Sequence, residues 1–232
     1  AVTDLPADRW FHFRFEALGQ VSRAGRLRTA PRPDASPDRL RFAFASCQQY
    51  EQGYYAAHRH MAAENLDLVV FLGDYIYESS WGSRHVRKHE APEPVTLEQY
   101  RNRYARYKSD ADLQRCHAAF PWLVTWDDHE VDNDYANDRS EDLDPNFLVR
   151  RAAAYQAFYE HMPVRLDPPT SGDWQIYRSV RFGDLAEFFV LDGRQYRSPQ
   201  PCDDADDAIV NRADCTGVDD LDDLDATMLG SV

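Results

Sequence analysis

Three short segments place potential metal ligands directly after apolar runs of the chain. They are residues 46–48 (SCQ), 73–78 (GDYIYE) and 127–134 (DDHEVDND). In open α/β sheets, ligands bind at the carboxyl ends of the strands. If each apolar run is a strand, the segments bring thiolate, carboxylate, phenolate, imidazole and amide groups to one rim. The sequence therefore predicts a metal centre at that rim.

The segment DDHE at residues 127–130 gives the strongest signal. Its three carboxylates lie within four residues and repel one another unless a cation compensates their charge. A solvated acidic loop is the ordinary alternative, but it does not explain why the preceding run is so apolar. The segment therefore favours a metal site over a loop.

The remaining candidates have ordinary explanations that the residues alone leave open. Asp74 is as often a turn-capping residue as a ligand, and Cys47 taken alone is most often an inert buried thiol. Tyr77 would ordinarily pack at the core or rim, and its phenolate forms at neutral pH only beside a strong Lewis acid such as Fe³⁺. Arg194 could hold an anionic oxygen through two hydrogen bonds or merely pair with surface acids.

Composition narrows the class of protein. The 232 residues are 43% hydrophobic and 13% aromatic, which excludes a disordered chain. No run approaches the roughly 18 apolar residues of a membrane span. With 40 acidic and 26 basic side chains, the net charge of −14 argues against a general nucleic-acid binder. The chain has no glycine-rich phosphate loop and no serine-hydrolase elbow. If the protein binds phosphate, a feature other than these motifs or its net charge must attract it.

Apolar strands that alternate with helices position these groups. We expect a strand over residues 40–47 with Leu40, Phe42 and Phe44 facing a core, a strand over 67–74 buried on both faces, and a buried strand over 118–128. The expected helices are residues 54–65, 96–109 with Thr96 as cap, and 145–162 with Pro145 at its start. Residues 174–194 predict a hairpin that turns at Gly183-Asp184. This order predicts an α/β sandwich with a mixed sheet.

The ends of the chain have a different character. Residues 1–30 carry the alternating pattern of strands, and the proline-rich residues 31–39 predict a linker to a second domain over 40–232. The aspartate-rich stretch 202–225 predicts a mobile, solvated loop. Its flanking Cys202 and Cys215 could form a disulfide or remain two free thiols, and the sequence does not separate these alternatives. We expect a chain that is truncated at both ends.

Three stretches taken together resemble a known family. Residues 42–78 (FAFASCQQYEQGYYAAHRHMAAENLDLVVFLGDYIYE), 123–138 (LVTWDDHEVDNDYAND) and 188–198 (FFVLDGRQYRS) closely resemble the PhoD-like alkaline phosphatases of the metallophosphoesterase superfamily. The combination of SCQ, GDYIYE and WDDHEV in this order is specific, and the resemblance extends from about Leu40 to the end of the chain.

The resemblance implies a fold and a set of roles. It implies a layered α/β sandwich of the metallophosphoesterase type, preceded by the end of a small N-terminal β-sandwich domain over residues 1–30. Residues 40–232 would then form the N-terminal part of the catalytic domain, with an incomplete metal site when taken alone. The implied roles are Cys47, Asp74 and Tyr77 as Fe³⁺ ligands, Asp74 as a bridge to Ca²⁺, Asn133 or Asp128 as a further Ca²⁺ ligand, and His129 and Arg194 as residues facing the phosphoryl group.

The implied activity is hydrolysis of phosphate monoesters, and also of diesters, by metal-activated water. A phosphodiesterase or phospholipase D-type enzyme on the same scaffold is one alternative, and a secreted calcium-binding module without catalysis is another. We expect a phosphate-ester substrate, no specific nucleic-acid partner and a monomer. The family resemblance implies a secreted, periplasmic or cell-surface location.

Overall fold

The computed structural model describes residues 2–170, 172–199 and 227–229. The predicted loop at 202–225 and the Cys202–Cys215 pair lie outside the described residues. No helix within these ranges is long and apolar enough to cross a membrane.

A three-stranded parallel sheet carries the ligand segments. Its order is β5 (Phe42–Ala45), β6 (Leu68–Phe71) and β7 (Trp122–Val124). In the register, Phe42 lies opposite Leu68 and Val69 lies opposite Trp122. Because the strands are parallel, their carboxyl ends share one edge of the sheet, as the sequence predicts.

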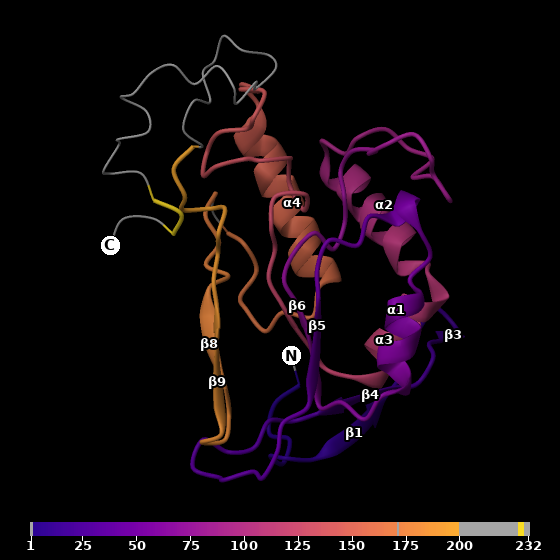
Figure 1. Ribbon diagram of the computed structural model, residues 1–232, viewed down its shortest axis with the longest axis vertical. Helices are drawn as coiled ribbons and strands as arrows, with labels where there is room; N and C mark the ends of the chain where they lie inside the picture. Colours follow the sequence, from indigo (N-terminus) through magenta and orange to yellow (C-terminus); the bar gives the residue numbers. More distant parts are fainter. Residues whose placement is uncertain (1, 171, 200–226, 230–232) are drawn as a thin grey trace.

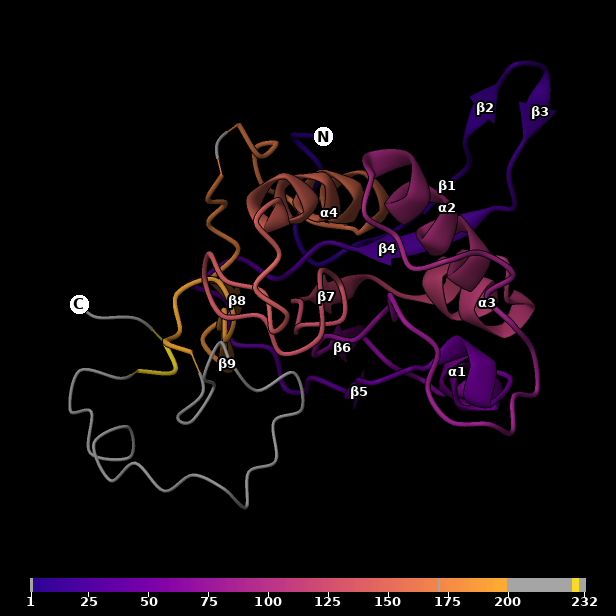
Figure 2. The same cartoon turned by 90° about the horizontal axis from the view of Figure 1, so that it is seen from above.

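Helices α1 (Ala56–Ala63), α2 (Leu97–Lys108) and α3 (Ala111–Ala119) lie on one side of this sheet, a hairpin lies on the other, and α4 (Phe147–His161) lies beside the edge strand β7 (Figures 1 and 2). A short 3₁₀ turn, η1 (Tyr50–Gln52), precedes the helices. The hairpin is β8 (Arg178–Phe182) with β9 (Ala186–Val190).

The core lies between the sheet and the helices. Val69 and Phe71 of β6 are fully buried and belong to the same apolar cluster as the tyrosines of α2. Tyr100, Tyr104 and Tyr107 are spaced by four and three residues, so they share one face of α2, and all are 0% exposed. These aromatic rings form the rigid support beneath the ligand-bearing edge of the sheet.

Local signals explain where the helices begin. The predicted cap at Thr96 is confirmed, since its hydroxyl accepts from the Gln99 amide and the Gln99 side chain accepts from the Thr96 amide. Helix α4 begins at Phe147 after Asn146, two residues later than expected. We did not predict α3, although Asp110 caps it by accepting from the amides of Asp112 and Leu113. The residues assigned to the start of a strand at 118 end this helix instead.

Two expectations about burial in the sheet are wrong: the phenylalanines of β5 do not face the core, and residues 67–74 are not buried on both faces. Phe42 and Phe44 are 47% and 67% exposed, and Leu72 is 49% exposed. The alternation is present, but the small Ala45 faces the helices while the phenylalanines face the side that the hairpin covers only in part. Phe42 meets Phe188 of the hairpin edge to face. Strand β7, in contrast, is buried throughout, as expected.

The predicted mixed sheet does not form within the described residues. Strands β8 and β9 pair only with each other, in a separate antiparallel sheet. The hairpin is joined to the parallel sheet through side chains instead, because Arg178 donates to the Val124 carbonyl and Thr125 donates to the Leu191 carbonyl.

The N-terminal residues form two antiparallel pairs. Strand β1 (Trp10–Phe13) pairs with β4 (Gly25–Arg28), and β2 (Glu16–Ala17) pairs with β3 (Gln20–Val21). Arg26 donates to the Ala119 carbonyl over 2.7 Å, and Arg28 forms an ion pair with Asp67 at the start of the parallel sheet. These strands therefore contact the α/β part directly.

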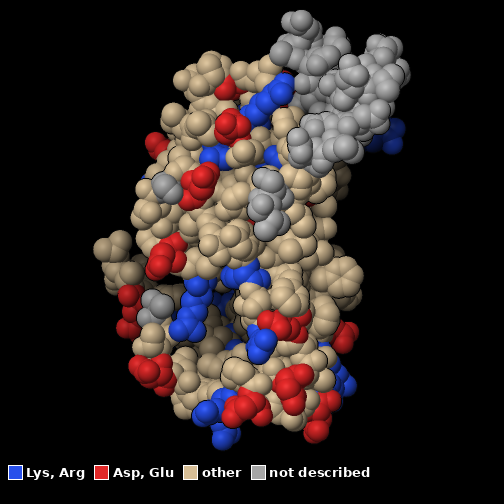
Figure 3. All heavy atoms as spheres, turned by 90° about the vertical axis from the view of Figure 1, so that its left-hand side faces the viewer, with Lys and Arg blue, Asp and Glu red and all other residues tan. Residues whose placement is uncertain are grey.

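The surface charge is unevenly distributed. On the face in Figure 3, lysine and arginine side chains gather around a hollow, and acidic side chains are scattered around them. The net charge of −14 therefore does not describe the local potential at this hollow.

Lys108 at the end of α2 should make stability depend on pH. Burial lowers the pKa of Lys108 to about 8, and its ammonium donates to the His161 carbonyl. The folded chain therefore binds this proton more weakly than the unfolded chain, so the free energy of unfolding should rise between pH 8 and about 10.5. Lys108→Met should lose this rise, about 1–3 kcal/mol. Urea unfolding of both proteins across this range checks it, and parallel profiles would contradict the expectation.

Candidate metal centre

Backbone contacts hold the ends of β5, β6 and β7 together. The Cys47 amide donates to the Gly73 carbonyl and the Gln48 amide to the Asp74 carbonyl, both over 3.1 Å. Cys47 and Asp74 each have a φ of +57°, which is strained for residues other than glycine. Non-glycine residues kept in this conformation at adjoining strand ends indicate a site where the direction of the side chain matters.

Two carboxylates and an imidazole from two of these strand ends form a cluster. Asp74, Asp128 and His129 are buried, and each offers one atom within 4.8 Å of the others. The Oδ1 atom of Asp74 is buried without a hydrogen-bond partner. A buried carboxylate oxygen left unpartnered beside a second carboxylate is costly, and a cation would satisfy both. The donors present therefore fit a metal ion.

Tyr77 and Cys47 extend the cluster. The Tyr77 hydroxyl donates to Asp74 Oδ2 over 3.2 Å. The Cys47 thiol, whose residue is exposed, lies within hydrogen-bonding reach of Asp74 and Tyr77. The structure thus places all three residues predicted to hold Fe³⁺ next to one another. Thiolate, phenolate and carboxylate are donors that suit a strongly Lewis-acidic ion.

The protonation of these groups reflects burial and mutual repulsion. Burial raises the pKa of the Cys47 thiol, and burial together with the charge of Asp74 raises the pKa of Tyr77. Burial also raises the pKa of Asp74, which the charge of His129 opposes and that of Asp128 reinforces. A cation at this position would favour the ionised form of each group.

His129 is fixed by contacts on three sides. Its Nδ1 donates to Glu78 Oε2 over 2.8 Å, its ring stacks on Tyr77 at 4.1 Å, and Trp81 meets it edge to face at 5.7 Å. Burial lowers the pKa of His129, but the hydrogen bond and charge of Glu78, with Asp128 and Asp74, raise it to about 9. The Glu78 carboxylate therefore favours the protonated form of His129 in the metal-free chain and determines which way the ring faces.

Arg194 reaches the cluster from the segment that follows β9. Its guanidinium forms ion pairs with Asp127, Asp128 and Asp134 at 2.5, 3.3 and 3.4 Å. Its backbone amide donates to Asp192 Oδ1 over 3.0 Å. The structure therefore brings Arg194 to Asp128, and its positive charge offsets the acidic loop.

Asn133 is hydrogen-bonded to a residue outside the cluster. It is half-buried, and its amide nitrogen donates to Glu141 Oε2 over 2.6 Å rather than to a residue of the cluster. Sequence reasoning also did not assign Glu78 or Glu130, which hold cluster residues in place. The only signal for Glu130 is its position in DDHE, which does not reveal what it contacts.

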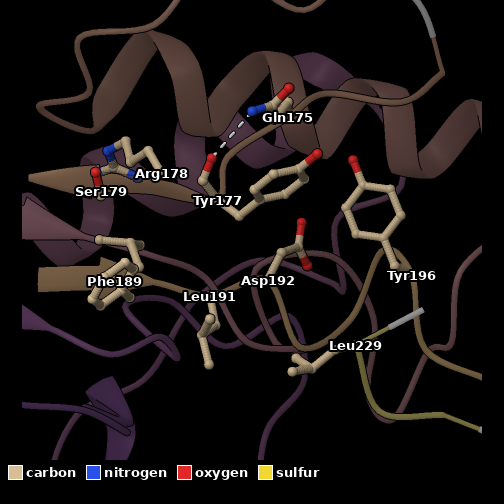
Figure 4. Close-up of a pocket in the computed structure, with 10 residues that line it drawn as sticks. Gln175, Tyr177, Arg178, Ser179, Phe189, Leu191, Asp192, Tyr196 and Leu229 are labelled. Carbon is tan, nitrogen blue, oxygen red and sulfur yellow. Dashed lines mark hydrogen bonds between the residues drawn. The ribbon is translucent and has the colours of Figure 1, made fainter. Parts of the chain in front are cut away.

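A pocket of about 640 Å³ lies at Asp192, two residues before Arg194 (Figure 4). The aromatic rings of Tyr177 and Tyr196 stand edge to face at 5.7 Å on one side, and Leu191 and Leu229 lie on the other. Asp192, which lines this pocket, also accepts from Trp126 Nε1 over 3.0 Å. Asp192 therefore connects the pocket to the segment that carries Arg194.

Comparisons with known proteins agree on one group of relatives. The profile of the family described as PhoD-like phosphatase matches residues 42–232. The chain is 51% identical over 209 residues to alkaline phosphatase D of Bacillus subtilis (strain 168), a match that covers 86% of this chain and 36% of the relative. A solved structure described as "Structure of PhoD" matches with a TM-score of 0.81 and 51% identity, over 85% of this chain and 39% of that one. The chain thus spans little more than a third of the length of each.

Proposed function

Because this chain belongs to the PhoD-like phosphatase family, we propose that the protein containing it is a metal-dependent phosphoester hydrolase. The observation that carries the proposal is the buried Asp74 oxygen without a partner, next to Asp128 and His129. His129 and Arg194 offset part of the negative charge, but Asp74 Oδ1 has no hydrogen-bond partner, and a bound cation would satisfy it. The family match then suggests the reaction that this cation serves.

In this proposal Cys47, Asp74 and Tyr77 hold Fe³⁺, and Asp74 with Asp128 or Asn133 holds Ca²⁺. When bound, such ions polarise phosphoryl oxygens and lower the pKa of water. The mutual contacts of Asp74, Tyr77 and Cys47 support the iron set. Asn133 lies in the same acidic loop as Asp128.

Arg194 and His129 supply fixed positive charge to the phosphoryl group and to the charge that develops during hydrolysis. The Glu78 carboxylate favours the protonated form of His129, and the Arg194 guanidinium lies 3.3 Å from Asp128. Because Glu78 and the Tyr77 ring hold the imidazole, and Asp127 and Asp128 hold the guanidinium, little reorganisation is needed when the substrate binds. The centre therefore attracts an anionic ester despite the acidic composition of the chain.

The proposal extends to organisation and location. Residues 1–30 would be the end of an N-terminal β-sandwich domain, 31–39 a linker, and 40–232 part of a layered α/β sandwich. The strand pairs within residues 10–28 and the parallel sheet support this division. We further propose that the protein acts as a monomer outside the cytoplasm.

Hydrolysis of an aryl phosphate and of a bis-aryl phosphate by the full-length protein tests the function. Chelation should lower both rates by roughly 100-fold or more, and Fe³⁺ with Ca²⁺ should restore them. The ratio of the two rates decides between a monoesterase and a diesterase. Undiminished turnover in chelator would contradict metal dependence, and calcium binding without any turnover would instead indicate a binding module.

A further inference from the structure

Glu130 is a buried carboxylate without a cationic partner. It is 1% exposed, and among the described residues it forms no ion pair. Burial and the charge of Asp74 raise the pKa of Glu130, whereas the backbone amides that it accepts from lower it. An acidic side chain in such surroundings is expensive to bury. Its contacts therefore need an explanation.

Those contacts are three backbone amides from two different loops. Oε2 accepts from the Asp74 amide over 3.1 Å and from the Asp127 amide over 2.8 Å, and Oε1 accepts from the Tyr75 amide over 2.5 Å. A carboxyl group presents two oxygens to these three converging N–H groups, whereas an amide side chain would turn an NH₂ donor toward at least one of them. Glu130 thus joins the loop after β6 to the loop after β7.

Each of these loops carries residues of the candidate metal centre. Asp74 belongs to the first, and Asp128 with His129 belongs to the second. A tight turn fixes Glu130 relative to Asp128, since the Val131 amide donates to the Asp128 carbonyl over 2.7 Å. The distance between the two candidate carboxylate ligands is therefore set through Glu130.

We propose, on the basis of the function proposed above, that Glu130 is a positioning residue that fixes the spacing of Asp74 and Asp128 for metal binding and the place of His129 beside them. It acts through the backbone and need not touch the ion or the substrate. Groups that orient ligands in this way commonly contribute about 10–100-fold to metal affinity.

Glu130→Gln tests this role in the full-length protein, with Glu51→Gln as the matched control. Glutamine has nearly the same shape, but its NH₂ group would face at least one of the three amides. Glu51 is also buried, at 2% exposed, and accepts from a backbone amide, that of His89 over 3.0 Å. Because Glu51 accepts from none of the amides of Asp74, Tyr75 and Asp127, its variant reports the general cost of burying an amide.

Two readouts are needed. In metal-free protein, hydrogen–deuterium exchange of the amides at 74, 75 and 127 should rise about tenfold or more in Glu130→Gln and remain unchanged in Glu51→Gln. By calorimetry, Ca²⁺ affinity should fall by about tenfold or more only in Glu130→Gln. Wild-type exchange and affinity in Glu130→Gln, or equal effects in both variants, would overturn the inference.

Glu130→Asp separates the effect of the carboxylate charge from the effect of side-chain length. It keeps the carboxylate but is one methylene shorter, so it should lose hydrogen bonds and affinity nearly as Glu130→Gln does. Wild-type affinity in Glu130→Asp would mean that charge, rather than the spacing of the loops, matters, and would overturn the inference. A wild-type protein that binds no metal would contradict the proposed function, and the exchange result alone would then decide whether Glu130 joins the loops.

Discussion

Asp74→Asn should remove the metal from the centre and lower kcat/KM for an aryl phosphate by on the order of 10³-fold. Asp74 accepts from the Tyr77 hydroxyl, lies within hydrogen-bonding reach of the Cys47 thiol, and has an oxygen within 4.8 Å of Asp128 and His129. An amide cannot bridge two cations, because it lacks the charge that offsets them. Metal content by elemental analysis and steady-state kinetics measure the two effects.

The same variant should not unfold the protein. Burial raises the pKa of Asp74, and its charge lies near those of Asp128 and Asp127, so the neutral amide relieves a cost in the metal-free state. Metal-free Asp74→Asn should therefore melt no lower than metal-free wild type. Asp67→Asn, at the opposite end of the same strand, is the control: it loses the ion pair with Arg28 but keeps its metal. Full metal content in Asp74→Asn would contradict the assignment.

Gly73→Ala should destabilise the fold by about 3 kcal/mol or more. Gly73 has a φ of +110°, and an added Cβ would lie 2.4 Å from the Asp127 nitrogen and 2.6 Å from the Trp126 carbonyl carbon. Both are backbone atoms, so the methyl group fits only if the ends of β6 and β7 move apart. Urea unfolding of the metal-free protein measures the loss.

Gly53→Ala is the control for Gly73→Ala. Its Cβ would meet no atom within 4 Å, and its φ of 174° is extended backbone that alanine adopts readily. It should change stability by less than about 1 kcal/mol. Equal stability of the two variants would show that the close approach at Gly73 does not limit the fold. Because the approach lies between the ligand loops, Gly73→Ala should also weaken metal binding.

The sequence was sufficient to place the ligand-bearing edge of the sheet. Apolar runs that end in SCQ, GDYIYE and WDDHE became parallel strands whose carboxyl ends meet, because parallel strands have one common direction. Which face of β5 would be buried was not predictable, since Phe42 and Phe44 alternate with alanines that fit closely beneath the helices. Which face of a strand is buried depends on what packs against each face, and the alternation of large and small side chains does not show this.

The residues of the candidate site were likewise predictable only in part. The residues that offer chemistry could be predicted, because thiol, phenol and acidic groups after apolar strands are unusual. The residues that orient them could not, because Glu78 and Glu130 act through contacts over 51, 55 and 56 positions of the chain. Helix α3 was missed for a local reason: its cap, Asp110, lies only two residues after the end of α2.

The proposed iron site is tested most directly by locating the metal in crystals of the full-length protein by anomalous scattering at the iron edge. We expect an iron peak in contact with Asp74, Tyr77 and Cys47, with a second, non-iron cation beside Asp74. An active protein with no iron peak, or with iron bound away from Asp74, would contradict this assignment.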